Sequence, residues 1–273
     1  MNRAGRLGAL YWAVLALLAT PLALLALTSL SDGLVVGYPL GRPTLRWYAE
    51  ALADPAFGQS FALSLGVAAS SSALAVVAGT WIALAAGALG SRALRWALRG
   101  GALLPLATPG IVHAVALRIA IQTVGLDPGP LAMVLGHAVH ATPYAVIMVG
   151  VRLASLPPEQ VGAAKTLGAG PARVFLRVVL PWLWPALFGS AALAALTSFD
   201  DFIRSFLLGG YDQTLPVLIF GRLRSGLTPE INAMATLVLL AACALGLAAD
   251  CLAGHRRRPG ALPLDPAKGR EAL

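Results

Sequence analysis

Long apolar runs separated by short polar segments extend along the whole chain. An α-helix needs about 20 apolar residues to cross the hydrocarbon core of a bilayer, and six runs reach that length. The sequence therefore predicts an all-α integral membrane protein with six transmembrane helices. The first run is too long for a signal-peptide core and is interpreted as an uncleaved anchor. The expected spans are residues 7–30, 61–89, 103–124, 131–153, 183–208 and 231–252.

The overall composition supports this class. Hydrophobic residues make up 58% of the 273 residues and charged residues only 12%, an apolar excess that no soluble domain could bury in one core. Both cysteines, Cys243 and Cys251, fall in the last apolar run. Their spacing puts them about two turns apart on one helix, too far for a disulfide. They are interpreted as small packing residues.

The arginines and lysines between the runs predict the orientation. Most of them fall on one side of the expected bundle, and the side rich in Lys and Arg is normally cytoplasmic. Both termini are therefore expected in the cytoplasm. The formal net charge of +8 is then a topology signal and does not indicate nucleic-acid binding. The basic residues on this side are Arg3, Arg6, Arg92, Arg95, Arg99, Arg152, Lys165, Arg173, Arg177, Arg256, Arg257, Arg258, Lys268 and Arg270.

The connections between the runs differ in kind. Residues 31–60 are rich in proline and aromatic residues and are expected to form an ordered outer cap. In the cytoplasmic segment 154–182, prolines that open helices and glycines that close them predict short helices at residues 160–167 and 172–179. Both are expected to lie outside the membrane, as a docking element for a partner.

At this segment the sequence resembles the inner-membrane permease subunits of ABC importers. Their signature is Glu-Ala-Ala, three residues, Gly, nine residues, an aliphatic residue, any residue and Leu-Pro. Gly162 stands at the glutamate position, and Glu159, one turn earlier, is the alternative acid. The register is otherwise kept by Ala163, Ala164, Gly168, Val178, Leu180 and Pro181. The resemblance implies a type I ABC importer permease fold, in which Glu159, Gly162, Ala163, Ala164, Leu167, Gly168, Leu180 and Pro181 couple the subunit to an ATPase.

Further motifs are similar to those of the spermidine/putrescine permease branch, and together they cover most of the chain. They lie at residues 104–112, 136–137, 143–144, 198–202, 214–217 and 228–233. The resemblance implies that the chain forms the path for a small charged solute, a polyamine in the first place, by alternating access. Paralogues in that branch carry other solutes, so an amine-containing zwitterionic or anionic solute stays open.

The resemblance also implies a set of partners. These are a dimer of ATP-binding subunits, a second and non-identical permease subunit, and an extracytoplasmic solute-binding protein, assembled on the bacterial cytoplasmic (inner) membrane. The chain contains no phosphate-binding Gly-x-x-x-x-Gly-Lys-Ser/Thr loop. ATP and Mg²⁺ are therefore expected on the ATPase, and neither enzymatic activity nor a cofactor is expected for this chain. Residues 1–255 are expected to form one permease domain, followed by a disordered cytoplasmic tail at 256–273.

Charged residues within the expected spans are candidates for the solute path. Asp200 and Asp201 fall in the fifth span, where charge is unfavourable by at least ~2.5–3.5 kcal/mol per residue. On one helix they would point about 100° apart, so at most one faces a central path. A carboxylate there would suit the ammonium groups of a polyamine. Arg204 stands at ion-pair spacing from both aspartates, so a self-neutralised structural cluster is an equal alternative.

Arg118 in the third span is the remaining candidate. Polyamine permeases usually carry uncharged residues at the positions of Arg118 and Arg204, and often an acid at that of Gly110. These departures weaken the case for a dication, so an amino acid-like, zwitterionic or anionic solute remains open.

Two further interpretations are weaker. His137 and His140 lie one turn apart, and two such ligands without a nearby acid favour helix packing over a metal site. A stand-alone proton-coupled secondary transporter is the other class compatible with intramembrane carboxylates. Such proteins commonly contain internal repeats, and no convincing repeat is found in this sequence.

Overall fold

The computed structural model describes residues 3–33, 42–226 and 228–254. The predicted tail at 256–273 lies outside the described residues. The chain divides into two compact units, a terminal unit (Met1–Ala49 with Thr228–Leu273) and a central unit (Glu50–Leu227). Apart from one isolated bridge between Ser31 and Pro43, the regular elements of the described residues are helices. This confirms the predicted all-α class.

The terminal unit contains the first and last helices, α1 (Arg3–Thr28) and α12 (Pro229–Gly254). The two helices contact each other, and the Asn232 side-chain amide donates a hydrogen bond to the Thr28 hydroxyl at 2.9 Å. The apolar side chains of α1 between Leu10 and Thr28 remain unburied.

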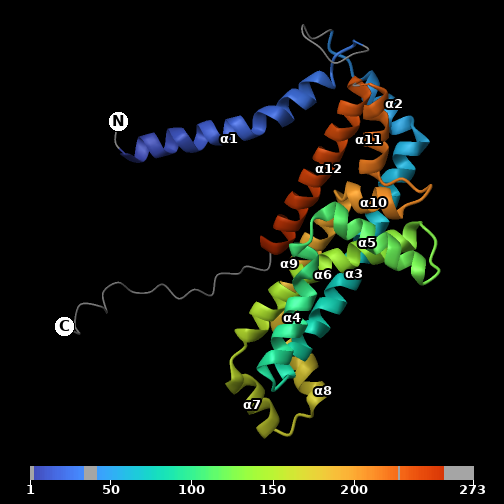
Figure 1. Cartoon of the computed structure of the whole chain (residues 1–273). Coiled ribbons are helices and arrows are strands. Elements are labelled where there is room, and N and C mark those ends of the chain that lie inside the picture. Colours follow the sequence, from blue (N-terminus) through green and yellow to red (C-terminus); the bar gives the residue numbers. More distant parts are fainter. Residues whose placement is uncertain (1–2, 34–41, 227, 255–273) are drawn as a thin grey trace. The chain divides into compact units, whose positions relative to one another are not determined.

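The core of the central unit consists of three long helices, α3 (Pro55–Ala88), α6 (Pro130–Ala154) and α9 (Leu180–Phe199), which pack against one another (Figure 1). The other helices of the central unit are shorter. They are α4 (Arg92–Ala107), α5 (Gly110–Thr123), α7 (Pro158–Thr166), α8 (Pro171–Val174), the π-helix η1 (Phe175–Val179), α10 (Phe202–Leu208) and α11 (Leu215–Ser225). Helix α2 (Arg46–Ala53) includes residues of both units.

Small residues line the contacts among the three core helices. Ala75, Ala141 and Ala194, one from each helix, form a fully buried cluster. Gly79 of α3 lies so close to α6 that a Cβ added there would stand 2.5 Å from the Cβ of Ala145. In a bilayer, small residues of this kind let helix backbones approach and pack.

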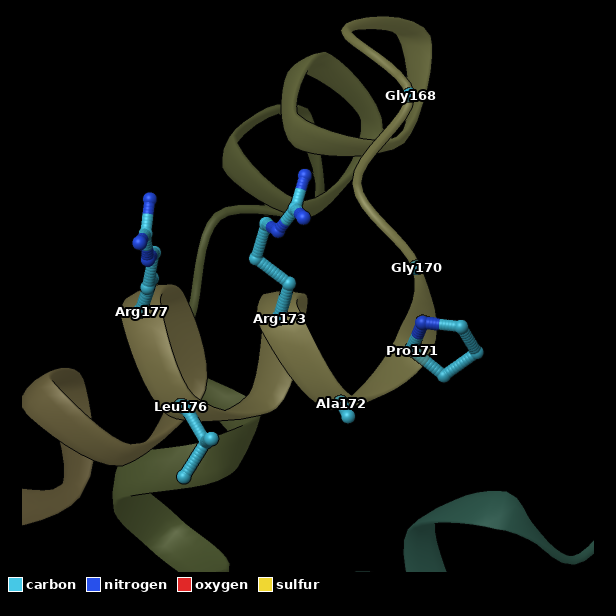
Figure 2. Close-up of a pocket in the computed structure, with 7 residues that line it drawn as sticks. All are labelled: Gly168, Gly170, Pro171, Ala172, Arg173, Leu176 and Arg177. Carbon is cyan, nitrogen blue, oxygen red and sulfur yellow. The ribbon is translucent and has the colours of Figure 1, made fainter.

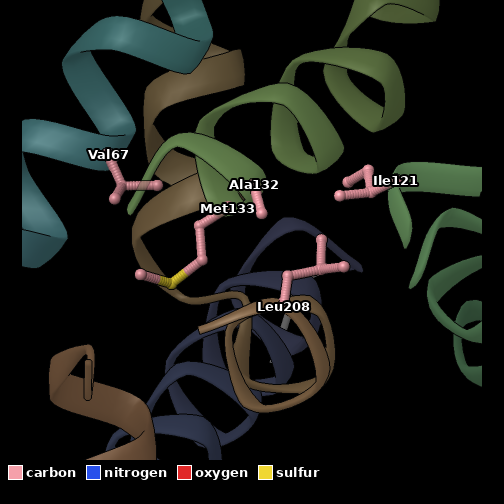
Figure 3. Close-up of a cluster of buried hydrophobic side chains, with 5 residues drawn as sticks. All are labelled: Val67, Ile121, Ala132, Met133 and Leu208. Atoms are coloured by element: carbon pink, nitrogen blue, oxygen red, sulfur yellow. The ribbon is translucent and has the colours of Figure 1, made fainter. Parts of the chain in front are cut away.

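Larger apolar side chains hold the short helices to this core. Leu208 at the end of α10 packs with Met133 and Ala132 of α6, Val67 of α3 and Ile121 of α5 (Figure 3). Leu208 and Met133 are both fully buried. This cluster fixes α10 against α3, α5 and α6, and α10 begins directly after the predicted solute-path aspartates.

By length and composition, four helices of the described residues can cross a membrane. They are Leu10–Thr28, Pro55–Ala88, Pro130–Ala154 and Pro171–Phe199, and α4 with α5 would make a fifth if the bent pair is counted as one span. The predicted sixth span falls on α12, in which Pro229–Cys243 is a shorter apolar helix. The protein is thus a multi-pass membrane protein, with fewer uninterrupted spans in the described residues than the six predicted.

The predicted third span, residues 103–124, is wrong as a single helix. Helix α4 ends at Ala107, α5 begins at Gly110, and the two are bent by 112°. Pro109 has no amide hydrogen to continue the helix, and a residue before proline is forced out of the helical region. Thr108 is accordingly extended, with ψ 132°.

The predicted separation of the helix 172–179 from the fifth span is also wrong. One helix runs from Pro171 to Phe199, passing through the π-helical turn η1. In that turn the Leu180 amide donates to the Phe175 carbonyl, and Pro181 follows without an amide to donate. A wider turn accommodates the missing donor, and the helix continues.

The predicted fifth span also ends earlier than expected. Helix α9 stops at Phe199, and α10 begins at Phe202. Asp200 and Asp201 therefore occupy a break between two helices, and the expectation that they are neighbours on one helix is wrong. In the predicted outer cap, α3 already begins at Pro55, and residues 34–41 lie outside the described residues.

Candidate functional site

The predicted coupling segment forms a short helix followed by a glycine turn. Helix α7 ends as the Leu167 amide donates to the Ala163 carbonyl and the Ala169 amide to the Ala164 carbonyl, each at 3.0 Å. Gly168 has φ +78°, the left-handed conformation that glycine adopts at helix ends without steric strain. The sequence-predicted turn at Gly168 is therefore present.

Most of the predicted coupling residues remain accessible. Leu167, at the tip, is 87% exposed. Glu159 lies in the first turn of α7, where its charge complements the helix dipole. Exposed with these two are Gly162, Ala163, Gly168 and Pro181, while Ala164 and Leu180 are partly buried.

A basic depression lies beside the turn. It has a volume of about 500 Å³ and is lined by Gly168, Gly170, Pro171, Ala172, Arg173, Leu176 and Arg177. Figure 2 shows the side chains of Arg173 and Arg177 directed to the same side, beside the loop that carries Gly168. From the sequence, Arg173 and Arg177 are predicted only as cytoplasmic charges and not as part of the docking element.

The two ends of the segment are tied together by one side-chain pair. The Nε of Arg152, at the end of α6, donates to the Trp182 carbonyl at 2.9 Å, and the Trp182 indole donates back to the Arg152 carbonyl at 3.0 Å. The guanidinium also lies 4.2 Å from the centre of the indole ring, a cation–π contact. The segment is therefore anchored to both α6 and α9.

The second group of predicted residues surrounds the break after α9. Asp201 and Arg204 are both buried and form an ion pair. Asp201 is also the N-cap of α10, because it accepts the Arg204 amide at 3.1 Å. The ion pair that the spacing predicted for Arg204 thus forms with Asp201.

Two histidines complete the surroundings of Arg204. Its Nη2 lies 2.9 Å from Nδ1 of His140 and 3.5 Å from Nδ1 of His113. A guanidinium can only donate, so Nδ1 of His140 accepts and carries no hydrogen. The sequence analysis had interpreted His140 as a helix-packing residue. The sequence does contain a signal for this cluster. His113, His137 and His140 fall within apolar runs, as does Arg204, and buried polar side chains of this kind usually contact one another.

A chain of hydroxyl groups continues from the cluster. His137 lies between the hydroxyls of Ser198, at 2.7 Å, and Ser205, at 3.3 Å. Ser71 of α3 donates to Ser198 at 2.9 Å. Helices α3, α6, α9 and α10 are therefore joined by buried polar contacts. No group of three or more metal-ligating side chains is found among the described residues.

The remaining two candidates, Asp200 and Arg118, differ in their surroundings. Arg118, partly buried on α5, donates to the Leu207 carbonyl at 2.8 Å and so satisfies a carbonyl near the end of α10. Asp200 is exposed, and its carboxylate has no hydrogen-bond or ion-pair partner within the part of the chain that the structure describes. Of the two candidate carboxylates, Asp200 is the one that is not paired with an arginine among the described residues.

Apolar helices of spanning length, a polar cluster buried among them and an exposed helix–glycine turn are the arrangement of a membrane permease. Residues 75–258 match the family model described as the inner membrane component of binding-protein-dependent transport systems. The chain therefore belongs to this family and is a permease subunit of an ABC importer.

Curated relatives agree with this assignment. The putrescine transport system permease protein PotI of Escherichia coli is 32% identical over 243 residues, which cover 85% of each chain. The spermidine/putrescine transport system permease protein PotC of Haemophilus influenzae is 30% identical over 200 residues, 73% of this chain and 77% of the relative.

Solved structures confirm the predicted type I importer permease fold. A chain of a bacterial ABC transporter involved in the import of alginate aligns with a TM-score of 0.66 at 16% identity, over 92% of this chain and 98% of that one. A chain of the methionine transporter MetNI aligns with a TM-score of 0.63 at 19% identity, over 74% and 96%.

Proposed function

We propose that this importer permease carries polyamines of the putrescine and spermidine class. The observation that carries the proposal is the exposed carboxylate of Asp200, which has no partner among the described residues. A polyamine presents ammonium groups, and a hydrogen bond between such a group and a carboxylate is of the strong, charge-assisted kind. The names of the relatives PotI and PotC point to the same solute class.

The neighbouring charges support a cationic rather than an anionic solute. Arg204 is paired with Asp201, so this buried pair adds no net charge beside Asp200. Arg118 is directed to a backbone carbonyl. The charge of Arg204 is therefore already compensated by Asp201, while the Leu207 carbonyl occupies one of the five N–H donors of Arg118.

We propose the other subunits of the importer from what is typical of its family. We assign ATP and Mg²⁺ to a dimer of separate ATPase subunits that docks on the segment around α7. A second, non-identical permease completes the path, and a solute-binding protein delivers the solute from outside. Both termini lie in the cytoplasm, and transport proceeds by alternating access.

The proposal is tested by measuring the ATPase activity of the reconstituted importer with its solute-binding protein. Putrescine, spermidine, a zwitterionic amino acid and an anionic amine compound are titrated separately. We expect stimulation by the two polyamines. Stimulation only by the zwitterion or the anion would contradict the polyamine proposal, and it would direct attention to Arg118 and Arg204.

The role of Asp200 is tested by substitution in the same assay. Asp200→Asn removes the charge and is expected to raise the half-stimulating polyamine concentration about tenfold or more, because hydrogen bonds to charged groups contribute about 1.5–3 kcal/mol. Asp200→Glu keeps the charge and should retain most of the response. If Asp200→Asn behaves as the wild type at equal expression, Asp200 does not contact the solute.

A further inference from the structure

Helix α4 carries an arginine-rich face in its first two turns. At about 100° per residue, Arg92, Arg95, Trp96 and Arg99 fall within an arc of about 100°. The same four residues line a depression of about 250 Å³. Trp96 is 71% exposed, Arg92 and Arg99 are exposed, and Arg95 is partly buried.

The guanidinium groups of this face are not neutralised within the part of the chain that the structure describes. Among the described residues, none of the three arginines has a carboxylate partner. Three like charges on one face repel each other, and a bound anion would relieve that repulsion. The face is therefore a site of net positive charge to which an anion would be attracted.

The position of the face along α4 indicates where that charge comes from. The arginines occupy the first two turns of the helix, and the last turns, from Ala102 to Ala107, carry no charge. An arginine stem can lie along the apolar region while its guanidinium reaches the headgroups. Trp96 has the amphipathic ring that is enriched at membrane–water interfaces. The arginines and Trp96 are thus arranged as at a headgroup boundary.

Helix packing also shows at which end of the central unit the arginine-rich face lies. Gly87, near the end of α3, lies next to Leu153, near the end of α6, since a Cβ added to it would be 3.5 Å from the Leu153 side chain. Helix α4 follows α3 and α7 follows α6. The arginine-rich face therefore lies at the same end of the central unit as the docking loop (Figure 1).

The geometry points to a binding site for the phosphate headgroup of an anionic phospholipid on the first two turns of α4. Arginine binds phosphate oxygens through two parallel hydrogen bonds, and basic residues near a membrane surface attract anionic lipids. The lipid would lie in the leaflet on the docking-loop side, with its headgroup against Arg92, Arg95 and Arg99 and its glycerol region against Trp96. This site is independent of the solute that the importer carries.

The test is the retention of phosphatidylglycerol by the whole purified importer, measured by native mass spectrometry after reconstitution in vesicles of phosphatidylcholine and phosphatidylglycerol. Each arginine near the surface contributes about 1 kcal/mol, or roughly fivefold in affinity. We expect the triple variant R92Q/R95Q/R99Q to lower retention by about tenfold or more. The control Arg224→Gln removes an exposed arginine that belongs neither to this face nor to the docking segment, and it should retain the lipid.

Insertion is controlled separately, because the orientation rule counts lysine and arginine alike. R92K/R95K/R99K preserves that signal and should bind the lipid more weakly than the wild type but better than the glutamine variant. If the triple glutamine variant fails to insert, Arg92→Gln and Arg95→Gln are compared singly, with an expected loss of roughly fivefold each.

Three outcomes would overturn the site. Equal retention in wild type and glutamine variants would mean that the arginines do not bind the lipid. Competition by inorganic phosphate at concentrations comparable to the lipid would indicate a site for free phosphate. Loss of the copurifying ATPase with unchanged lipid retention would identify the face as a protein interface.

Discussion

Asp201 shows how one side chain can stabilise a buried helix break. It caps α10 by accepting the Arg204 amide, and it neutralises the Arg204 guanidinium. Removing one partner of a buried pair leaves an uncompensated charge, which is strongly destabilising. Asp201 and Asp200 therefore have different roles although they are adjacent, since Asp200 is exposed.

Asp54 is a second residue with a double role, outside the spanning helices. It caps α3 by accepting the Ala56 amide at 2.9 Å and forms an ion pair with Arg222. Burial raises the pKa of Asp54, but hydrogen bonds from the Ala56 and Phe57 amides and the Arg222 guanidinium outweigh it, so the pKa is lower than its ordinary value of 3.8.

Two substitutions of Asp54 are expected to distinguish the contribution of the helix cap to stability from that of the ion pair with Arg222. Asp54→Ala loses both and should lower the free energy of unfolding by about 1 kcal/mol, measured by thermal unfolding of the detergent-solubilised protein. Asp54→Asn keeps a capping oxygen and should lose less. A group with a lowered pKa stabilises fully above its ordinary value and loses this effect as the pH falls through the folded-state pKa. The advantage of wild type over Asp54→Asn should therefore be full above pH 3.8 and vanish at lower pH; an advantage that persists in strong acid would contradict this account.

At the scale of elements, close helix contacts determine the central core. Gly79→Ala is expected to destabilise it by about 1–3 kcal/mol, as overpacking does, because the added Cβ would meet Ala145 at 2.5 Å and the Thr142 carbonyl at 3.0 Å. Gly66, on the same helix, has open space around it. Gly66→Ala is the matched control and should be neutral or slightly stabilising. Equal unfolding temperatures for the two variants would argue against the close contact of α3 with α6.

The elements also show what the sequence could predict. The spans expected at 61–89 and 131–153 correspond to α3 and α6, because their apolar composition is continuous and prolines stand at their starts. The third and fifth spans were placed incorrectly, since hydropathy measures the composition of a segment and not its direction. One residue pair, Thr108 and Pro109, turns the helix by 112° without changing the apolar character of the run.

Contacts between residues that are close in the sequence could be predicted, whereas contacts between distant residues could not. The spacing of Asp201 and Arg204 predicts their pairing, and the register around Gly168 predicts the turn. The contacts of Arg204 with His113 and His140 join residues 91 and 64 positions away from it. No local pattern carries such information. The exposure of Asp200 likewise depends on the end of α9 at Phe199, which the apolar pattern does not reveal.

At the scale of the whole molecule, the docking turn should control assembly of the importer. Gly168→Val places a β-branched residue at φ +78°, a conformation that costs about 1–2 kcal/mol for residues other than glycine. We expect less copurifying ATPase and slower solute uptake. Gly170 has φ −68° and open space, so Gly170→Val should assemble normally. Undiminished ATPase binding by Gly168→Val would show that the turn is not required for docking.

The uninterrupted helix from Pro171 to Phe199 acts as a lever. At about 1.5 Å per residue, its 29 residues span about 43 Å, from the arginine depression at one end to Asp200 just past the other. No loop separates the two ends, so a displacement at Arg173 is not absorbed by a flexible joint. A rigid tilt of about 10° about one end of a rod of that length moves the other end by about 7 Å. We therefore expect a displacement beside Arg173 to be transmitted along this helix to Asp200.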